Sequence, residues 1–75
     1  MTKNIEKALK EGNQAHQQGQ IQEAREYYNE ILQIQPKHPD ANHNMGTLSA
    51  NLGKYEQALN FLETAVQSNP KIEQF

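Results

Sequence analysis

Apolar residues recur at intervals of three and four along the first half of the chain. This spacing puts them on one face of an α-helix, and no stretch alternates apolar and polar residues for long enough to indicate a strand. The first stripe predicts a helix over about residues 3–18, and its members are Ile5, Ala8, Leu9, Gly12 and Ala15. The second predicts a helix from residue 21 to just before Pro36, and its members are Ile21, Ala24, Tyr28, Ile31 and Leu32, with Tyr27 alongside.

The second half of the chain repeats this scheme. A third stripe predicts a helix that stops at Gly53, and it consists of Ala41, Met45, Leu48 and Leu52. A fourth predicts a helix closed by Asn69 and Pro70, and it consists of Tyr55, Ala58, Leu59, Leu62, Ala65 and Val66. The pattern therefore predicts an all-α chain of two helical hairpins.

Glycine and proline separate the predicted helices. Gly19 divides the first pair, and residues 36–40 contain two prolines, so they cannot continue a helix. Pro39 suits the first turn of the third helix, where its missing N–H costs nothing, and Asp40 suits the positive end of that helix.

A 34-residue internal repeat relates the two halves. Six positions are identical in type at this shift, and the pairs are Gly12 and Gly46, Gly19 and Gly53, Ala24 and Ala58, Gln33 and Gln67, Pro36 and Pro70, and Lys37 and Lys71. The identical positions are mostly small residues and helix breakers, while apolar residues are replaced by other apolar residues. This distribution indicates a packing constraint.

Gly12 and Gly46 lie in the middle of the first and third predicted helices. A glycine there costs about 1 kcal/mol relative to alanine, so its recurrence at one phase indicates a packing reason. We expect these glycines to let the partner helix, which presents Ala24 or Ala58, approach closely. Tyr28 and Leu62, four positions after these alanines, are then expected to fill the space between successive layers. A larger residue at either alanine is expected to cost a few kcal/mol by overpacking.

Size and charge narrow the function classes. A chain of 75 residues makes one small domain that buries only about 60% of its unfolded surface. Its net charge of -2 argues against a general nucleic-acid or anionic-membrane binder, because such proteins need clustered Lys and Arg. The one small basic group alternates with glutamates at helical spacing and is interpreted as a solvated face; it consists of Lys3, Lys7 and Lys10.

Residues that could carry chemistry are few. The chain has no cysteine, which excludes disulfides and thiolate metal sites, and its first residues do not resemble a secretory signal, so a cytoplasmic location is expected. His38 and His43 flank Asp40, but a proline-broken turn separates the histidines and no third strong ligand accompanies them. They are interpreted as loop and groove residues, and the isolated His16 likewise.

No catalytic constellation is recognisable. Ser49 and Ser68 lack a nucleophile-elbow context, and the glycines do not form a phosphate-binding loop. Three glutamates at helical spacing are interpreted as a solvated helix face, and they are Glu23, Glu26 and Glu30. The sequence therefore predicts no enzyme activity, no cofactor and no metal site.

The repeat resembles the tetratricopeptide repeat, a 34-residue helical hairpin. The matching residues are Gly12, Gly19, Ala24, Tyr28 and Pro36 in the first half, and Gly46, Gly53, Tyr55, Ala58, Leu62, Ala65 and Pro70 in the second. The resemblance spans about residues 5–72. It implies one domain over residues 1–75, with two antiparallel helix-turn-helix hairpins stacked as a short right-handed α-solenoid. Repeat 1 would cover about 5–38, repeat 2 about 39–72, and 73–75 would begin a truncated third unit or capping segment.

The chain departs from the family pattern at a few positions. Ala8 and Asn42 stand where the family often has a large residue. Glu11 stands where the second unit has the apolar Met45, which suggests that the first helix acts as an N-terminal cap. Residues 36–46 are also similar to bacterial repeats and to repeats of the O-linked N-acetylglucosamine transferase type. One alternative is therefore an N-terminal repeat fragment of a larger transferase-type protein, although no transferase domain lies in these residues.

The resemblance implies a concave groove lined by the first helix of each hairpin. The candidate groove residues are Glu6, Leu9, Lys10, Asn13, His16, Gln17, Asp40, His43, Asn44, Thr47 and Asn51. Asn44 coincides with the asparagine that grips ligand backbone amides in the O-linked N-acetylglucosamine transferase type. An asparagine suits this role because it offers a donor and an acceptor. The alternative is that Asn13 and Asn44 are merely solvated.

A carboxylate clamp of the kind that binds heat-shock chaperones is not favoured. Asn13 and Asn44 match two of its polar positions, but Leu9 stands where the first lysine belongs, and the third repeat with its basic pair is missing. A carboxylate requires charge-assisted donors, of which this groove has few.

The fourth helix carries more apolar surface than one hairpin should cover, because such solenoids normally need about three repeats and a polar cap. The candidates for a self-association or packing face are Leu59, Phe61, Leu62, Val66, Ile72 and Phe75. Two hypotheses follow: a peptide- or protein-binding module, and a homodimer formed through the last helix. We expect the last-helix face to meet a partner first, and the charge and hydropathy predict neither nucleic acid nor membrane as that partner.

Overall fold

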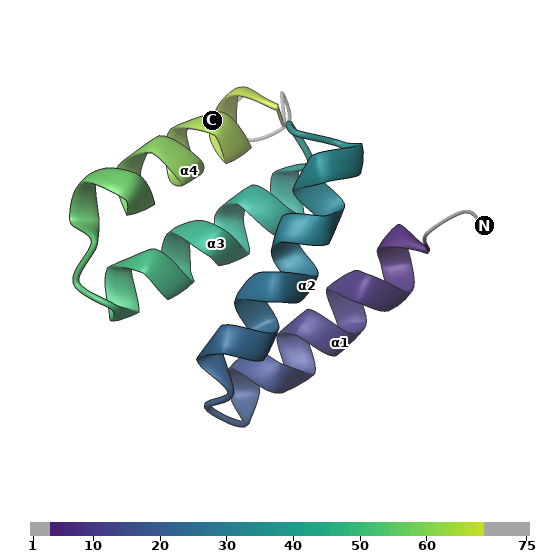
Figure 1. Cartoon of the computed structure of the whole chain (residues 1–75). Coiled ribbons are helices and arrows are strands. Elements are labelled where there is room, and N and C mark those ends of the chain that lie inside the picture. The colour runs from purple at the N-terminus through teal and green to yellow at the C-terminus, as the bar shows by residue number, and fades with distance from the viewer. Residues whose placement is uncertain (1–3, 69–75) are drawn as a thin grey trace.

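The computed structural model describes residues 4–68, which form helices and connecting turns without any strand. The helices are α1 (Ile5–Gln17), α2 (Ile21–Ile34), α3 (Pro39–Asn51) and α4 (Tyr55–Gln67). Helix α1 pairs with α2 and α3 with α4, while α2 joins the two hairpins by packing on α3 (Figure 1). The predicted all-α fold of two stacked hairpins is confirmed. The predictions for Asn69, Pro70, Ile72 and residues 73–75 lie outside the described residues.

Side chains fix where α1 and α3 begin. The backbone N–H of Lys7 donates to Asn4 Oδ1 over 3.0 Å, so α1 begins at Ile5, inside the predicted start at about residue 3. His38 Nδ1 accepts the backbone N–H of Ala41 over 3.1 Å and caps α3. Pro39 occupies the first turn of α3, as predicted.

Two glycines close the hairpins. Gly19 and Gly53 have φ angles of 78° and 79°, the left-handed region that glycine adopts without a Cβ penalty. Leu52, which the apolar pattern placed on the third helix, is instead the residue that follows α3. Its side chain is 45% exposed, because the chain turns away at Gly53.

The core lies where α2 meets α1 and α3. It is centred on Tyr28, which is fully buried, and contains Ala15, Ala24, Tyr28, Met45 and Leu48. Partly buried hydrophobic residues from α1, α2 and α4 pack around it, and they are Leu9, Ile21, Leu32 and Phe61. Met45 and Leu48 of α3 therefore complete the core of the first hairpin.

The mid-helix glycines make room for large side chains. A Cβ built on Gly12 would lie 2.7 Å from Tyr28 Cε1, and one on Gly46 would lie 2.7 Å from Leu62 Cγ. The partner helix approaches both glycines closely, as expected, and at Gly46 the Ala58 carbonyl oxygen is 3.2 Å from the built Cβ. At Gly12 the nearest atoms belong to the two tyrosines, because the Tyr28 ring is larger and lies over the glycine.

Asn42 is a polar residue in the core that the sequence marked only as a departure. Its side chain is 3% exposed. The Nδ2 group donates to the carbonyl oxygens of Pro36 over 3.0 Å and His38 over 2.9 Å. Both carbonyls belong to the proline-containing turn, so Asn42 fixes the connection between the hairpins where a large apolar residue could not.

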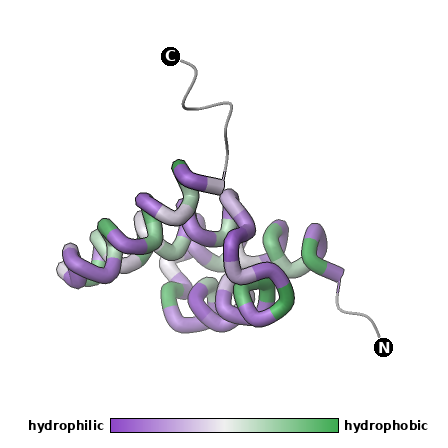
Figure 2. Tube along the Cα trace, turned by 90° about the horizontal axis from the view of Figure 1, so that it is seen from above, coloured by the Kyte–Doolittle hydropathy of each residue, from purple (hydrophilic) through white to green (hydrophobic). Residues whose placement is uncertain are grey.

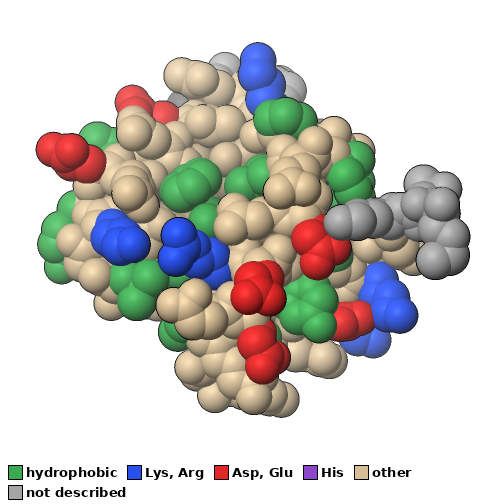
Figure 3. Space-filling view, viewed as in Figure 1, with side chains coloured by type: hydrophobic (Ala, Val, Ile, Leu, Met, Phe, Trp, Pro, Cys, Tyr) green, Lys and Arg blue, Asp and Glu red, His purple; other side chains and the backbone are tan. Residues whose placement is uncertain are grey.

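The surface carries no field of one sign on the side shown in Figure 3, where acidic, basic and apolar side chains are interspersed. Hydrophobic and hydrophilic positions alternate around each helix in Figure 2, as amphipathic helices require. Within residues 4–68, no helix is both long and apolar enough to cross a membrane.

Candidate functional site

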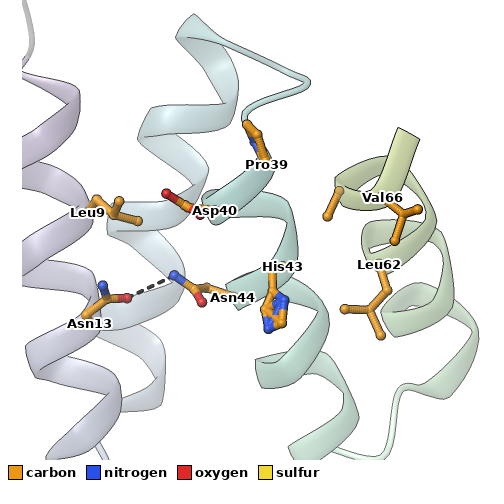
Figure 4. Close-up of a pocket in the computed structure, with 9 residues that line it drawn as sticks. Leu9, Asn13, Pro39, Asp40, His43, Asn44, Leu62 and Val66 are labelled. Carbon is orange, nitrogen blue, oxygen red and sulfur yellow. Dashed lines mark hydrogen bonds between the residues drawn. The ribbon is translucent and has the colours of Figure 1, made fainter. Parts of the chain in front are cut away.

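A wide cavity of about 610 Å³ extends over α3 from α1 to α4 (Figure 4). Helix α1 contributes Leu9 and Asn13 on one side. On the other side Leu62, Ala65 and Val66 of α4 supply apolar surface. The first half of α3 forms the floor between them, and its lining residues are Pro39, Asp40, His43 and Asn44.

A hydrogen-bond network lies at the α1 side of this cavity. Asn13 Oδ1 accepts from Asn44 Nδ2 over 2.9 Å, across the two hairpins (Figure 4). It also accepts from the Tyr28 hydroxyl over 2.8 Å. The interpretation of Asn13 and Asn44 as merely solvated residues is therefore wrong. Because Tyr28 is buried and its hydroxyl must be paired, it holds the Asn13 amide in one orientation. Burial also raises the pKa of the Tyr28 phenol.

The network leaves two hydrogen-bonding groups unused. Asn13 has committed its oxygen, so its Nδ2 hydrogens remain as donors, while Asn44 has committed its nitrogen, so its Oδ1 remains as an acceptor. Neither side chain is buried, and no buried side-chain nitrogen or oxygen within residues 4–68 lacks a partner. The cavity thus presents a donor and an acceptor side by side.

A second polar contact lies further along the same faces of α1 and α3. Asn51 Nδ2 is 3.4 Å from His16 Nε2, and the His16 ring meets the edge of the Tyr28 ring with centroids 6.4 Å apart. His16 is isolated from other candidate residues in the sequence, but in the structure it contacts both Asn51 and Tyr28. The repeated faces of α1 and α3 are connected at two levels.

A model of the tetratricopeptide repeat family matches residues 15–74. The chain belongs to this family. The predicted membership is confirmed, and the match leaves out residues 5–14, where Ala8 and Glu11 depart from the family pattern. Tetratricopeptide repeats are generally protein–protein interaction modules and are typically not catalytic. No curated protein matches the chain in sequence.

The structure divides the predicted groove residues of this tetratricopeptide module into three groups. Those that line the cavity are Leu9, Asn13, Asp40, His43 and Asn44. His16 and Asn51 pair beside it. The remainder lie outside its lining, where Glu6, Lys10, Gln17 and Thr47 are exposed and the Thr47 hydroxyl donates to the His43 carbonyl. The sequence missed Pro39 and Ala65, which line the cavity only because α4 lies beside the start of α3.

The predicted self-association residues do not share one face. Leu59 and Val66 are 59% and 41% exposed, and with Leu62 they line a shallow depression on α4. Leu62 and Val66 also line the large cavity, so the groove and the open face are continuous. Phe61 instead packs against the core and faces the first hairpin. Ile72 and Phe75 lie outside the described residues.

The outer face of α1 is polar. Lys7, Glu11 and Gln14 stand 34 residues before Ala41, Met45 and Leu48, the buried residues with which α3 faces the first hairpin; these counterparts are given by the internal repeat. The Glu11 carboxylate accepts a hydrogen bond from the Tyr27 hydroxyl, which raises the pKa of Tyr27. This polarity supports the prediction that α1 is a terminal helix of the stack.

The described residues offer no obvious metal centre. No group of three or more His, Cys, Asp or Glu side chains within residues 4–68 is arranged to hold an ion. His38 and His43, which flank Asp40 in sequence, separate in the structure, since His38 caps α3 and His43 lines the cavity.

Proposed function

We propose that this tetratricopeptide module binds a partner protein by holding an extended segment of it in the cavity over α1 and α3. The observation that carries the proposal is the pairing of Asn13 with Asn44. This bond leaves one donor and one acceptor at the cavity, and a peptide unit of the partner offers the complementary carbonyl oxygen and N–H.

The Tyr28 hydroxyl strengthens this arrangement before any ligand arrives. Because it donates to Asn13 Oδ1, the Asn13 Nδ2 hydrogens are aimed away from the core. Side chains that are already ordered lose less conformational entropy on binding, so a weak backbone contact becomes more effective. Contacts to the peptide unit alone are insensitive to the partner's side chains, and selectivity must come from the rest of the cavity.

The test begins with blocked peptides of random sequence, whose strongest binder is titrated into isotope-labelled protein. The side-chain amide resonances of Asn13 and Asn44 should shift, and Asn44→Ala should weaken binding by about fivefold, as expected for one hydrogen bond. Asn29→Ala, an exposed change on α2, is the matched control and should leave the affinity unchanged. Equal affinity for wild type and Asn44→Ala would contradict the proposal.

Self-association through α4 is a second candidate function, and the exposure of Leu59 and Val66 favours it. Leu62 stands 34 residues after Tyr28, which is fully buried under the next hairpin, whereas Leu62 borders the open depression. Light scattering over a concentration series tests this candidate. A dimer that is lost in Leu59→Glu and kept in Leu52→Glu, a similarly exposed leucine elsewhere, would support it; a monomer at every concentration would reject it.

A further inference from the structure

We infer that the cavity selects a partner segment in which an aliphatic side chain is followed by a lysine or arginine. This inference rests on the proposed function and adds the chemical class of the ligand. It is carried by three neighbouring features of the same cavity: the amide pair, an apolar slot and one carboxylate.

The apolar slot lies on the α4 side of the cavity. Leu62 and Val66 project toward the cavity from α4, and Pro39 bounds it at the start of α3 (Figure 4). Val66 is 41% exposed, so its surface is available to a ligand. A peptide whose backbone lies on Asn13 and Asn44 can extend over α3 and place an aliphatic side chain in this slot, which removes apolar surface of both from water.

Asp40 sets the charge preference. Among residues 4–68 it is the only carboxylate in the lining, and none of their lysines or arginines lines the cavity. The Asp40 side chain is exposed, forms no ion pair within residues 4–68, and points across the groove toward Leu9 in Figure 4. A cationic side chain next to the aliphatic one would pair with Asp40. An acidic side chain or a terminal carboxylate would be repelled by Asp40, and His43 is the one basic side chain among the described lining residues.

Three peptides with acetylated and amidated ends test the inference. They share an alanine background and contain Leu-Lys, Leu-Glu or Ala-Lys at the centre. Each is titrated into the isotope-labelled chain, and dissociation constants are taken from the shifts of cavity resonances. Wild type should bind the Leu-Lys peptide about fivefold more tightly than the Leu-Glu peptide, the upper range for an exposed ion pair. This ratio should decrease as salt is added.

Two variants with matched controls separate charge from apolar contact. Asp40→Asn should bring the Leu-Lys to Leu-Glu ratio close to one. Glu56→Gln removes a carboxylate from the second residue of α4, as Asp40→Asn does from the second residue of α3, and should leave the ratio unchanged. Val66→Thr should weaken Leu-Lys binding about threefold and Ala-Lys binding much less. Ile34→Thr, at an exposed position of α2, should change neither.

The outcomes distinguish this inference from the proposed function. If all three peptides shift the Asn13 and Asn44 amides with equal affinity, peptide binding stands and the selectivity is wrong. If none of the three shifts them although the strongest random-sequence binder does, only the selectivity is wrong. If no peptide of either set shifts them, both are wrong. If the Leu62 and Val66 resonances shift with protein concentration alone, a second copy occupies the slot and the inference is overturned.

Discussion

The Asn44 side-chain amide donates to Asn13 Oδ1 across 2.9 Å and so joins α3 to α1, the first helices of the two hairpins. Contact between these helices is otherwise sparse, since α2 carries most of the packing between the hairpins. The bond therefore adds a direct polar link between the hairpins. It also defines which atoms the cavity offers to a ligand.

Removing the Tyr28 hydroxyl should weaken this network while leaving the core filled. Tyr28→Phe keeps the buried ring but deletes the donor to Asn13 Oδ1, so the free energy of unfolding should fall by about 1 kcal/mol. Urea unfolding followed by circular dichroism measures the change. Tyr55→Phe is the control, because Tyr55 is 72% exposed, and should change stability by a few tenths of a kcal/mol at most. Equal effects of the two substitutions would contradict the assigned role of the hydroxyl.

Gly46→Ala should destabilise the second hairpin despite alanine's higher helix propensity. Its Cβ would lie 2.7 Å from Leu62 Cγ and 3.2 Å from the Ala58 carbonyl oxygen, and relieving such contacts typically costs about 1–3 kcal/mol. A double-mutant cycle with Leu62→Ala identifies the contact responsible. The Gly46→Ala change should cost less in the Leu62→Ala background, as judged by urea unfolding. An equal cost in both backgrounds would instead implicate the Ala58 backbone.

The helices and their pairing could be predicted from the sequence because they depend on local rules. The 3–4 spacing of apolar residues gives four amphipathic helices, and Gly19 and Gly53 mark the turns where the structure has positive φ. The repeat assigned Tyr28 to packing between layers, and Tyr28 is fully buried. These features act over a few residues or recur at a fixed spacing, which is why a single sequence reveals them.

The polar contacts were not predictable, because they depend on how far apart the hairpins sit. Nothing in the sequence distinguishes an Asn13 that bonds to Asn44 from one that faces water. The role of Asn42 was equally hidden, because the carbonyls that it binds belong to a turn whose conformation the prolines only restrict. Phe61 falls within the apolar run of α4, but only the position of the first hairpin shows that it packs inward.

Alkaline pH should destabilise the fold through its tyrosines. Burial raises the pKa of Tyr28 above the ordinary value of 10.0, so the folded state keeps a proton that the unfolded state releases. The stability is therefore intact below about pH 10 and declines as the pH rises further. Tyr27 adds to the slope, because its hydrogen bond to Glu11 raises its pKa. Urea unfolding at several pH values should show a shallower alkaline decline for Tyr28→Phe than for wild type; identical slopes would contradict this origin.

Introducing a charge at Phe61 should destabilise the fold far more than introducing one at Leu59. Phe61 packs against the core, so Phe61→Glu buries a carboxylate and deletes aromatic packing, and the free energy of unfolding should fall by about 3 kcal/mol or more. Leu59 is 59% exposed, so Leu59→Glu should change stability by about 0.5 kcal/mol or less. Thermal unfolding measured by circular dichroism separates the two. A loss of association in Phe61→Glu would then reflect unfolding, whereas the same loss in a stable Leu59→Glu protein would locate the interface on α4. A large loss of stability in Leu59→Glu would mean that this face is already covered in the folded protein.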